Sequence, residues 1–510
     1  MINTIHFFFI VYFDFDKKYV IGSASYMLTL LSDNMADKRS GMNTETFRKH
    51  AHELVDWMAD YFENVENYPV MSQVKPGYIL KQIPTKAPNQ AESFDQVLKD
   101  FNDIIMPGIT HWESPNFMAY FPANKSKGSV LAEMLMSTLG AQCMQWLTSP
   151  AAAELEEQMM NWLQEMLGLP KDFTGVIQDT ASTATLCALL TAREKATDYQ
   201  INQKGYEERK FTIYASKEIH SSIDKDVKIA GFGIEQLRKI EVDESFAMIP
   251  ENLEKQIKLD LKAGFIPLCV VSAIGTTSTT AIDPINEIGS ICQKYKVWHH
   301  VDAAYAGTAL VLPEMRWMSE GIEKADSFVF NPHKWMFTNF DCTAYFVKDP
   351  VGLVNTFTIT PDYLKTNFDG EVKNYRDWGI PLGRRFRALK LWFVIREMGV
   401  EGIQEKIRKH ITLGSWLAKE ITEHADFELL APVPLNTVCF RYTKTETSEL
   451  DKVNEKIMNQ VNASGKLFFT QTKLNGMLAL RLAFGNTNLE AFHVENAWKL
   501  IQETAKNLEH

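Results

Sequence analysis

The middle of the chain alternates short apolar runs with helical patterns, and this alternation limits the fold more than any other feature. Several of the runs are apolar throughout, as strands are when helices cover both faces of a sheet. The runs lie at 174–178, 211–215, 268–273, 297–301 and 327–330, and the helical segments at 183–197, 222–230 and 284–295. The pattern predicts an α/β domain built on a mainly parallel sheet.

The segments that flank this domain have a different character. An amphipathic helix is predicted over 44–64, with Thr44 as its N-cap, and another near 93–105; prolines between 69 and 88 separate the two. An apolar stripe on such an arm needs a partner surface, so residues 42–126 are predicted to form a helical dimerisation arm.

The C-terminal segment is predicted to form a smaller α+β domain. Helical patterns run from about 388 to 424, hairpin-like strands are expected near 438–441, 465–470 and 477–482, and a last helix covers 489–508. The expected boundaries are therefore 127–391 for the large domain and 392–510 for the small one.

Residues 1–41 do not fit either domain. Their apolar stretch at 6–13 is interrupted by Asp14, Asp16 and the lysines that follow, and it is too short to span a bilayer. A basic start and a small-residue cleavage site, which a secretion signal needs, are missing. We expect a disordered leader or an upstream-start extension, with Met35 and Met42 as alternative starts.

The composition favours a globular protein that binds a small molecule. The chain has 510 residues, of which 45% are hydrophobic and 23% charged, and this composition argues against the disordered and fibrous classes. A net charge of −11 argues against nucleic acid or a membrane surface as partner. The 6 cysteines are scattered without metal-binding spacing, which predicts no metal site and a reducing cytoplasm.

Two predicted strands end in residues that carry chemistry. Asp302 follows the run at 297–301, and Lys334 follows the run at 327–330 among Asn, Pro and His. Carboxyl ends of parallel strands meet at the ligand-binding edge of a sheet. Taken alone, an aspartate at such a position can simply cap a loop or a helix, and a lone lysine is usually at the surface. As a pair, however, the two residues indicate pyridoxal phosphate, because its aldehyde binds a lysine and its ring nitrogen binds a carboxylate.

A phosphate site and an aromatic ring for the cofactor also have candidates. Small hydroxyl residues at 179–185 lie between a predicted strand and a helix N-terminus, where backbone N–H groups favour an anion, although such residues are also ordinary N-caps. His220 follows the strand at 211–215 and opens the next helix. Its imidazole either caps that helix or stacks on the cofactor.

Together these motifs resemble the group II pyridoxal-phosphate decarboxylases, most closely the aromatic-L-amino-acid decarboxylases. The similarity runs from about 42 to about 508. The segments that carry it are 331–335 (NPHKW), 300–307 (HVDAAYAG), 114–122 (SPNFMAYFP), 148–152 (TSPAA) and 380–386 (IPLGRRF). The resemblance implies fold type I, which is similar to that of aspartate aminotransferase, and a homodimer with shared active sites.

The resemblance also implies a role for each matching residue. Lys334 would carry the cofactor as a Schiff base, Asp302 would bind the pyridinium nitrogen, and His220 would stack over the ring. Tyr363, in a mobile loop, would complete decarboxylation as a proton donor. Phosphate and ring contacts would come from Ala181, Ser182, Asn331, His333, Thr277 and Ala304. The wall for the substrate side chain would be formed by Trp112, Tyr120 and Phe121, with Gln142 and Met144 from the other subunit.

Some positions differ from the family pattern. Asp179 stands where animal members carry glycine, Ala123 where they carry threonine, and Met144 where they carry an aromatic residue. Gly383 matches plant enzymes that have glycine for indolic substrates and serine for phenolic ones. The predicted substrate is therefore an aromatic L-amino acid, indolic or catecholic rather than small, which the enzyme converts to the amine and CO2.

Three alternatives compete with this prediction. An aldehyde synthase on the same scaffold would be marked by Phe at 363 or Asn at 220, whereas this chain has Tyr363 and His220. A relative that acts on glutamate or another acidic amino acid would need a cationic side-chain site, which the aromatic wall argues against. An inactive dimerising protein would lack the cofactor, and a yellow colour on purification would separate it from an enzyme.

Overall fold

The computed structural model describes residues 42–508 apart from 207, 360, 362, 363, 365, 366 and 369. The leader predicted at 1–41 and the side chain of Tyr363 lie outside the described residues. The chain divides into two compact units, of which one holds residues up to Asn64 with Val74–Gly108, and the other holds Val65–Gln73 with the chain from Ile109 onward.

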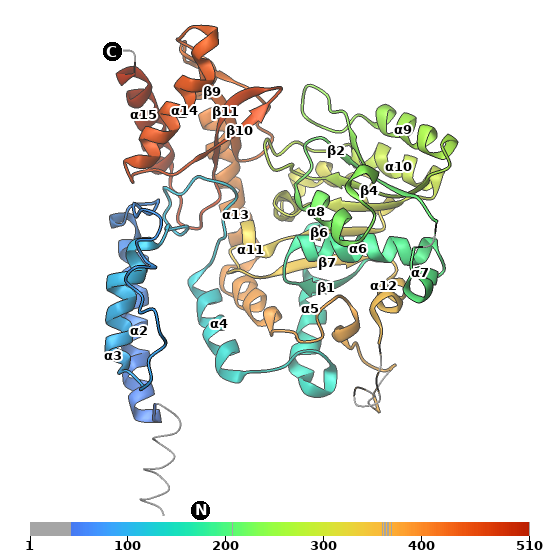
Figure 1. Cartoon of the computed structure of the whole chain (residues 1–510), viewed down its shortest axis with the longest axis horizontal. Helices are drawn as coiled ribbons and strands as arrows, with labels where there is room; N and C mark the ends of the chain where they lie inside the picture. Colours follow the sequence, from blue (N-terminus) through green and yellow to red (C-terminus); the bar gives the residue numbers. More distant parts are fainter. Residues whose placement is uncertain are drawn as a thin grey trace, which may run out of the picture. The chain divides into compact units, whose positions relative to one another are not determined.

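The larger unit is built on a 7-stranded sheet in the order β1-β7-β6-β5-β4-β2-β3 (Figure 1). β7 pairs antiparallel with both of its neighbours, and the other strands run in one direction. The strands are β1 (Thr174–Gln178), β2 (Phe211–Ser216), β3 (Leu237–Ile240), β4 (Ile266–Ala273), β5 (Trp298–Asp302), β6 (Ser327–Phe330) and β7 (Thr343–Val347). The predicted mainly parallel sheet is confirmed.

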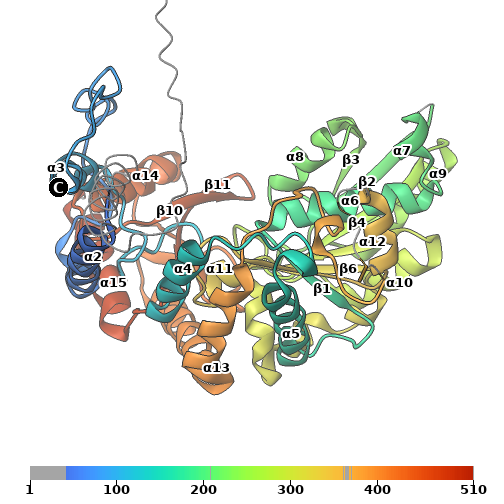
Figure 2. The same cartoon turned by 90° about the horizontal axis from the view of Figure 1, so that it is seen from below.

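Helices cover both faces of this sheet, which explains the continuous apolar runs. Successive residues of a strand point to opposite faces. Val271 of β4 packs in a cluster with Ala188 of α6, whereas Val270 packs with Ile257 of α9. Figure 2 shows α6 and α5 on opposite sides of the sheet. The helices are α4 (Lys127–Leu139), α5 (Pro150–Leu167), α6 (Ala181–Ala196), α7 (Gln200–Lys204), α8 (Ser222–Ile229), α9 (Pro250–Lys262), α10 (Ile285–Tyr295), α11 (Pro332–Trp335) and α12 (Pro350–Phe357).

A second, 4-stranded antiparallel sheet lies in the C-terminal part of the same unit, in the order β10-β11-β9-β8. Its apolar face packs against residues of the helices that surround it. The strands are β8 (Phe427–Leu429), β9 (Thr437–Tyr442), β10 (Thr470–Leu474) and β11 (Met477–Ala483), and the helices are α13 (Arg387–Glu423), α14 (Leu450–Ala463) and α15 (Ala491–Asn507). This is the predicted α+β arrangement.

One local prediction in this part was wrong. The strand expected at 465–470 begins only at Thr470, because the side chain of Asn462 binds both the N–H and the C=O of Phe469 and takes that residue out of a strand ladder. The helical patterns predicted between 388 and 424 correspond to α13, in which two helical segments meet at a kink where Gly399 has a non-helical φ of 66°.

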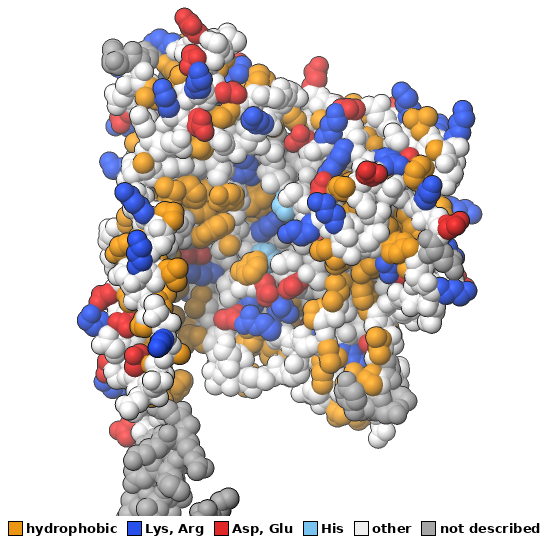
Figure 3. All heavy atoms as spheres, in the orientation of Figure 1, with side chains coloured by type: hydrophobic (Ala, Val, Ile, Leu, Met, Phe, Trp, Pro, Cys, Tyr) orange, Lys and Arg blue, Asp and Glu red, His pale blue; other side chains and the backbone are white. Residues whose placement is uncertain are grey.

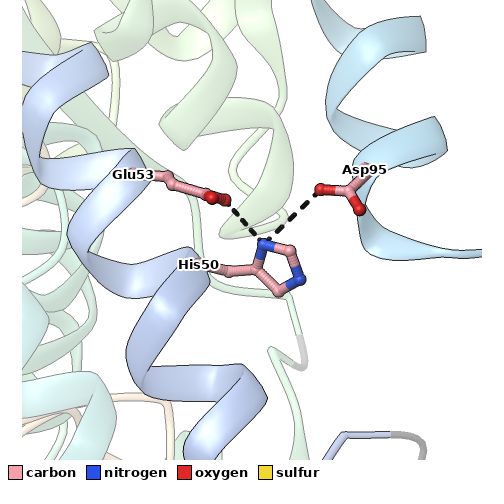
Figure 4. Close-up of side chains that lie close together, drawn as sticks. All are labelled: His50, Glu53 and Asp95. Atoms are coloured by element: carbon pink, nitrogen blue, oxygen red, sulfur yellow. Dashed lines mark hydrogen bonds and ion pairs between the residues drawn. The ribbon is translucent and has the colours of Figure 1, made fainter.

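The smaller unit contains α2 (Thr44–Asn64) and α3 (Phe94–Asp100), as the amphipathic pattern predicts. Trp57 of α2 packs edge-on against Phe101, and its Nε1 donates to Asn102 Oδ1 at 3.1 Å. His50 Nδ1 lies 2.7 Å from Glu53 Oε2 and 3.8 Å from Asp95 Oδ1 (Figure 4). Of the helices in the described ranges, none has the length and apolar character needed to cross a membrane.

Candidate active site

Neighbouring strands of the large sheet deliver the predicted residues to one cavity. Asp302 is the last residue of β5, Lys334 lies on α11 directly after β6, and His220 follows β2. Because β6, β5, β4 and β2 are adjacent and parallel, their carboxyl ends share one edge. The cavity at this edge has a volume of about 280 Å³. The other predicted residues that line it are Phe121, Ala181, Ser182, Thr277, Ala304, Asn331 and His333.

Lys334 has the properties of a nucleophilic amine. Burial lowers the pKa of Lys334, an effect that the charge of Asp302 opposes and that of Arg481 increases. Its Nζ lies 5.5 Å from the centroid of the Phe121 ring. A lysine with a lowered pKa presents more of the neutral amine, which is the form that attacks a carbonyl carbon.

Asp302 and His220 present an acceptor and a donor to the same cavity. Asp302 is 8% exposed, and its Oδ1 accepts the Ala304 N–H at 3.0 Å. His220 Nδ1 accepts the Ser222 N–H at 3.2 Å, and since an N–H only donates, the imidazole proton is on Nε2. Burial lowers the pKa of His220, and the charge of Lys334 adds to this effect, so the neutral ring is favoured.

One side of the cavity is the N-terminus of α6. Thr180 is the N-cap and accepts the Thr183 N–H on its side chain at 3.3 Å. Ala181 and Ser182 occupy the first helical positions, where N–H groups lack an acceptor within the helix and favour an anion. Asp179 Oδ1 accepts the Thr180 N–H at 2.6 Å, so this N–H group is not available to a bound anion.

Two side chains after β6 add donors to the same region. Asn331 Oδ1 accepts the Thr343 hydroxyl at 2.8 Å, which leaves its Nδ2 group for the cavity. His333 Nδ1 accepts the Cys342 N–H at 3.0 Å, and burial lowers the pKa of His333 to about 3, so Nε2 carries the proton of a neutral ring. A donor-lined cradle, a strand-end carboxylate and an amine of lowered pKa match the phosphate, the ring nitrogen and the aldehyde of pyridoxal phosphate.

A larger cavity of about 650 Å³ adjoins the first, since Phe121, His220, Thr277 and Lys334 line both. Its wall is aromatic. Trp112 stacks on Tyr120 with 5.8 Å between ring centroids, and Phe468 meets Tyr120 edge-on at 6.1 Å. The face of the molecule drawn in Figure 3 has a hollow near its middle, where apolar and cationic side chains lie side by side.

Arg481 was not predicted from the sequence, although it lines the larger cavity. It is 4% exposed, and its guanidinium donates to the backbone oxygens of Tyr120 at 2.7 Å, Thr277 at 2.9 Å and Ser278 at 3.0 Å. The guanidinium therefore joins the aromatic wall to the loop after β4. The sequence signal that could have identified Arg481 is its position as the single charged residue inside the apolar run 477–483.

Gln142, Met144 and Gly383 are not among the residues that line these two cavities. Gln142 and Gly383 line a third cavity of about 340 Å³ together with Arg384. The Met144 carbonyl accepts the Arg376 N–H at 2.7 Å, close along the chain to Gln142. A single chain therefore keeps this predicted part of the substrate wall apart from Lys334.

The sheet order and the cavity at its carboxyl edge define a pyridoxal-phosphate enzyme of fold type I. Residues 76–443 match the pyridoxal-dependent decarboxylase conserved domain, and the chain belongs to this family. It is a pyridoxal-phosphate-dependent amino-acid decarboxylase.

Comparison with individual proteins finds several plant enzymes that are similar to this chain. It is 42% identical to phenylacetaldehyde synthase of Arabidopsis thaliana over 92% of this chain and 98% of that protein. It is 41% identical to tyrosine decarboxylase 2 of Narcissus pseudonarcissus over 92% of this chain and 96% of that protein. The crystal structure of Catharanthus roseus tryptophan decarboxylase in complex with L-tryptophan matches with a TM-score of 0.87 and 39% identity, covering 92% and 99% of the two chains.

Proposed function

We propose that the enzyme converts an aromatic L-amino acid to the corresponding amine and CO2. The observation that carries this proposal is the aromatic wall of the 650 Å³ cavity beside Lys334. Among the described residues that line it, the one cation besides Lys334 and the titratable His220 is Arg481, whose donors are bound to backbone oxygens. An acidic side chain would lack a free cationic partner there.

The proposed roles follow from the contacts in the cavity. Bound pyridoxal phosphate stabilises the negative charge that the loss of CO2 leaves on the α-carbon. Asp302 would keep a proton on the ring nitrogen, Lys334 would hold the cofactor, and His220 would offer its Nε2–H as a donor beside the ring. Ala181, Ser182, Asn331 and His333 would hold the phosphate, and Thr277 and Ala304 would contact the ring.

The test is a substrate panel. Purified enzyme with pyridoxal phosphate is incubated with aromatic and acidic amino acids, and CO2, amine and hydrogen peroxide are measured. Amine from an aromatic amino acid is expected, and faster turnover of glutamate than of any aromatic substrate would contradict the proposal.

An aldehyde synthase is the second candidate, because phenylacetaldehyde synthase is a close relative. We favour the amine because His220 and Tyr363 are both present. If Tyr363 delivers the proton to the α-carbon, Tyr363→Phe should still release CO2 but yield aldehyde, ammonia and hydrogen peroxide in an oxygen-dependent reaction. Amine at the wild-type rate without peroxide would show that the proton comes from elsewhere, with His220 the next candidate.

We further propose a homodimer in which each subunit completes the site of the other, with residues 42–126 as the dimerisation arm, 127–391 as the cofactor domain and 392–510 as the small domain. Support comes from α4, where Leu131 is 53%, Leu135 49% and Leu139 64% exposed along one side of the helix. It also comes from the separation of Gln142 and Gly383 from Lys334 within one chain.

Subunit complementation tests this arrangement. Lys334→Ala and Gly383→Trp should each be inactive alone. In a mixed dimer, one site combines an intact Lys334 from one subunit with an intact Gly383 from the other, so co-expression should restore part of the activity. No recovery in isolated mixed dimers would contradict shared sites.

We propose the cytoplasm as the location and no nucleic-acid or membrane partner. All 6 cysteines are free and buried, as in proteins of reducing compartments, and the net charge is −11. Fractionation of cells that express the full chain would test the location.

A further inference from the structure

The third cavity holds Gln142 in a fixed orientation. The Arg384 N–H donates to Gln142 Oε1 at 2.7 Å, and the Cys143 N–H donates to the Arg384 carbonyl at 3.0 Å, so two bonds join the segments. Because a backbone N–H only donates, the amide oxygen of Gln142 must face Arg384. The Nε2 group, with its two N–H donors, therefore points away from that bond.

Gly383 leaves this Nε2 group uncovered. A Cβ atom at position 383 would lie 3.3 Å from Gln142 Nε2 and 4.0 Å from Oε1. Any side chain there would press on the donor. Among the described residues, Nε2 has no hydrogen-bond partner, whereas the neighbouring cations are bound, Arg384 to Glu156 and Arg385 to Glu133. The cavity of about 340 Å³ thus contains an oriented donor with room beside it.

We propose that Gln142 Nε2 donates a hydrogen bond to a ring oxygen of the substrate, and that the enzyme therefore selects aromatic amino acids with a ring hydroxyl. The inference rests on the proposed function, in which Gln142 and Gly383 of one subunit complete the substrate site of the other. The space at Gly383 admits a bicyclic ring, so hydroxyindoles fit as well as phenols and catechols. A ring without oxygen leaves the donor unpaired, and one such hydrogen bond corresponds to about a 10-fold change in kcat/KM.

The test compares matched substrates in one enzyme preparation. The ratio of kcat/KM for 5-hydroxytryptophan to that for tryptophan, and for tyrosine to that for phenylalanine, does not depend on the fraction of active enzyme. Gln142→Leu keeps the size of the side chain and removes the donor, so both ratios should fall about 10-fold.

Ser137→Ala is the matched control, because Ser137 lines the same cavity without the Arg384 bond. It should leave both ratios unchanged. Equal ratios in wild type and Gln142→Leu, or an equal fall in Ser137→Ala, would overturn the proposal for Gln142. Failure of the proposed function is a different result, because then no aromatic amino acid would yield amine with any variant.

Discussion

Replacing Glu156 by alanine should destabilise the protein far more than the same change at its neighbour Glu157. Glu156 lies on α5 and is 3% exposed. Its Oε1 accepts the Ile177 N–H at 2.8 Å and an N–H of Arg384, which is 7% exposed and also donates to the Ile177 carbonyl at 3.0 Å. This pair joins α5, β1 and the segment before α13.

The expected magnitudes follow from burial. Removing one partner of a buried ion pair leaves an unpaired charge, which costs about 3–5 kcal/mol. Glu157 pairs with Lys373 at 2.7 Å, but the two side chains are 43% and 32% exposed, so that pair contributes about 0–1 kcal/mol. Both changes are Glu→Ala on one helix, and the difference in helix propensity therefore cancels.

Urea unfolding followed by tryptophan fluorescence and far-UV circular dichroism measures the difference, at fixed protein and pyridoxal phosphate concentrations. Glu156→Gln keeps an acceptor for the Ile177 N–H and should lose less than Glu156→Ala. Because Arg384 also holds Gln142, Glu156→Ala should lower the hydroxyl preference as well. Equal losses for Glu156→Ala and Glu157→Ala would refute the reasoning.

Three further predictions concern the cofactor and pH. Borohydride reduction of the holoenzyme and peptide mapping should place a pyridoxyl group on Lys334; a label on another lysine would exclude Lys334 as the cofactor-binding residue. Asp179→Gly frees the Thr180 N–H, so the Kd for pyridoxal phosphate in a titration of the apoenzyme should fall about 3- to 10-fold, and an unchanged Kd would contradict this. Burial raises the pKa of Glu113 from 4.5 to about 7, against the charge of Lys125. The folded state therefore favours the protonated acid, and its contribution to stability is lost as pH rises through about 7. Glu113→Gln should raise the thermal midpoint relative to wild type at pH 8 but not at pH 5, and a constant difference between these pH values would count against it.

The sequence alone determined the features that are encoded locally. Continuous apolar runs followed by polar residues predict buried strands with chemistry at their ends, because parallel strands covered on both faces have no polar side. Asp302, His220 and Lys334 each follow such a run, so their common edge could be expected without coordinates. The strand order confirmed the predicted mainly parallel sheet, and the match to the family model confirmed the predicted decarboxylase family.

Other features were decided only by the tertiary structure. Every residue of β7 is buried, and a fully buried strand has the same apolar pattern whether it runs parallel or antiparallel to its neighbours. The sequence therefore does not reveal that β7 is antiparallel. Arg481 reaches the site because β11 lies beside the aromatic wall, and its partners are distant along the chain. The orientation of Gln142 depends on the backbone N–H of Arg384, a group that every residue except proline carries. A pattern of side chains cannot specify which distant backbone group an amide will meet, because only the packing of the chain brings the two together.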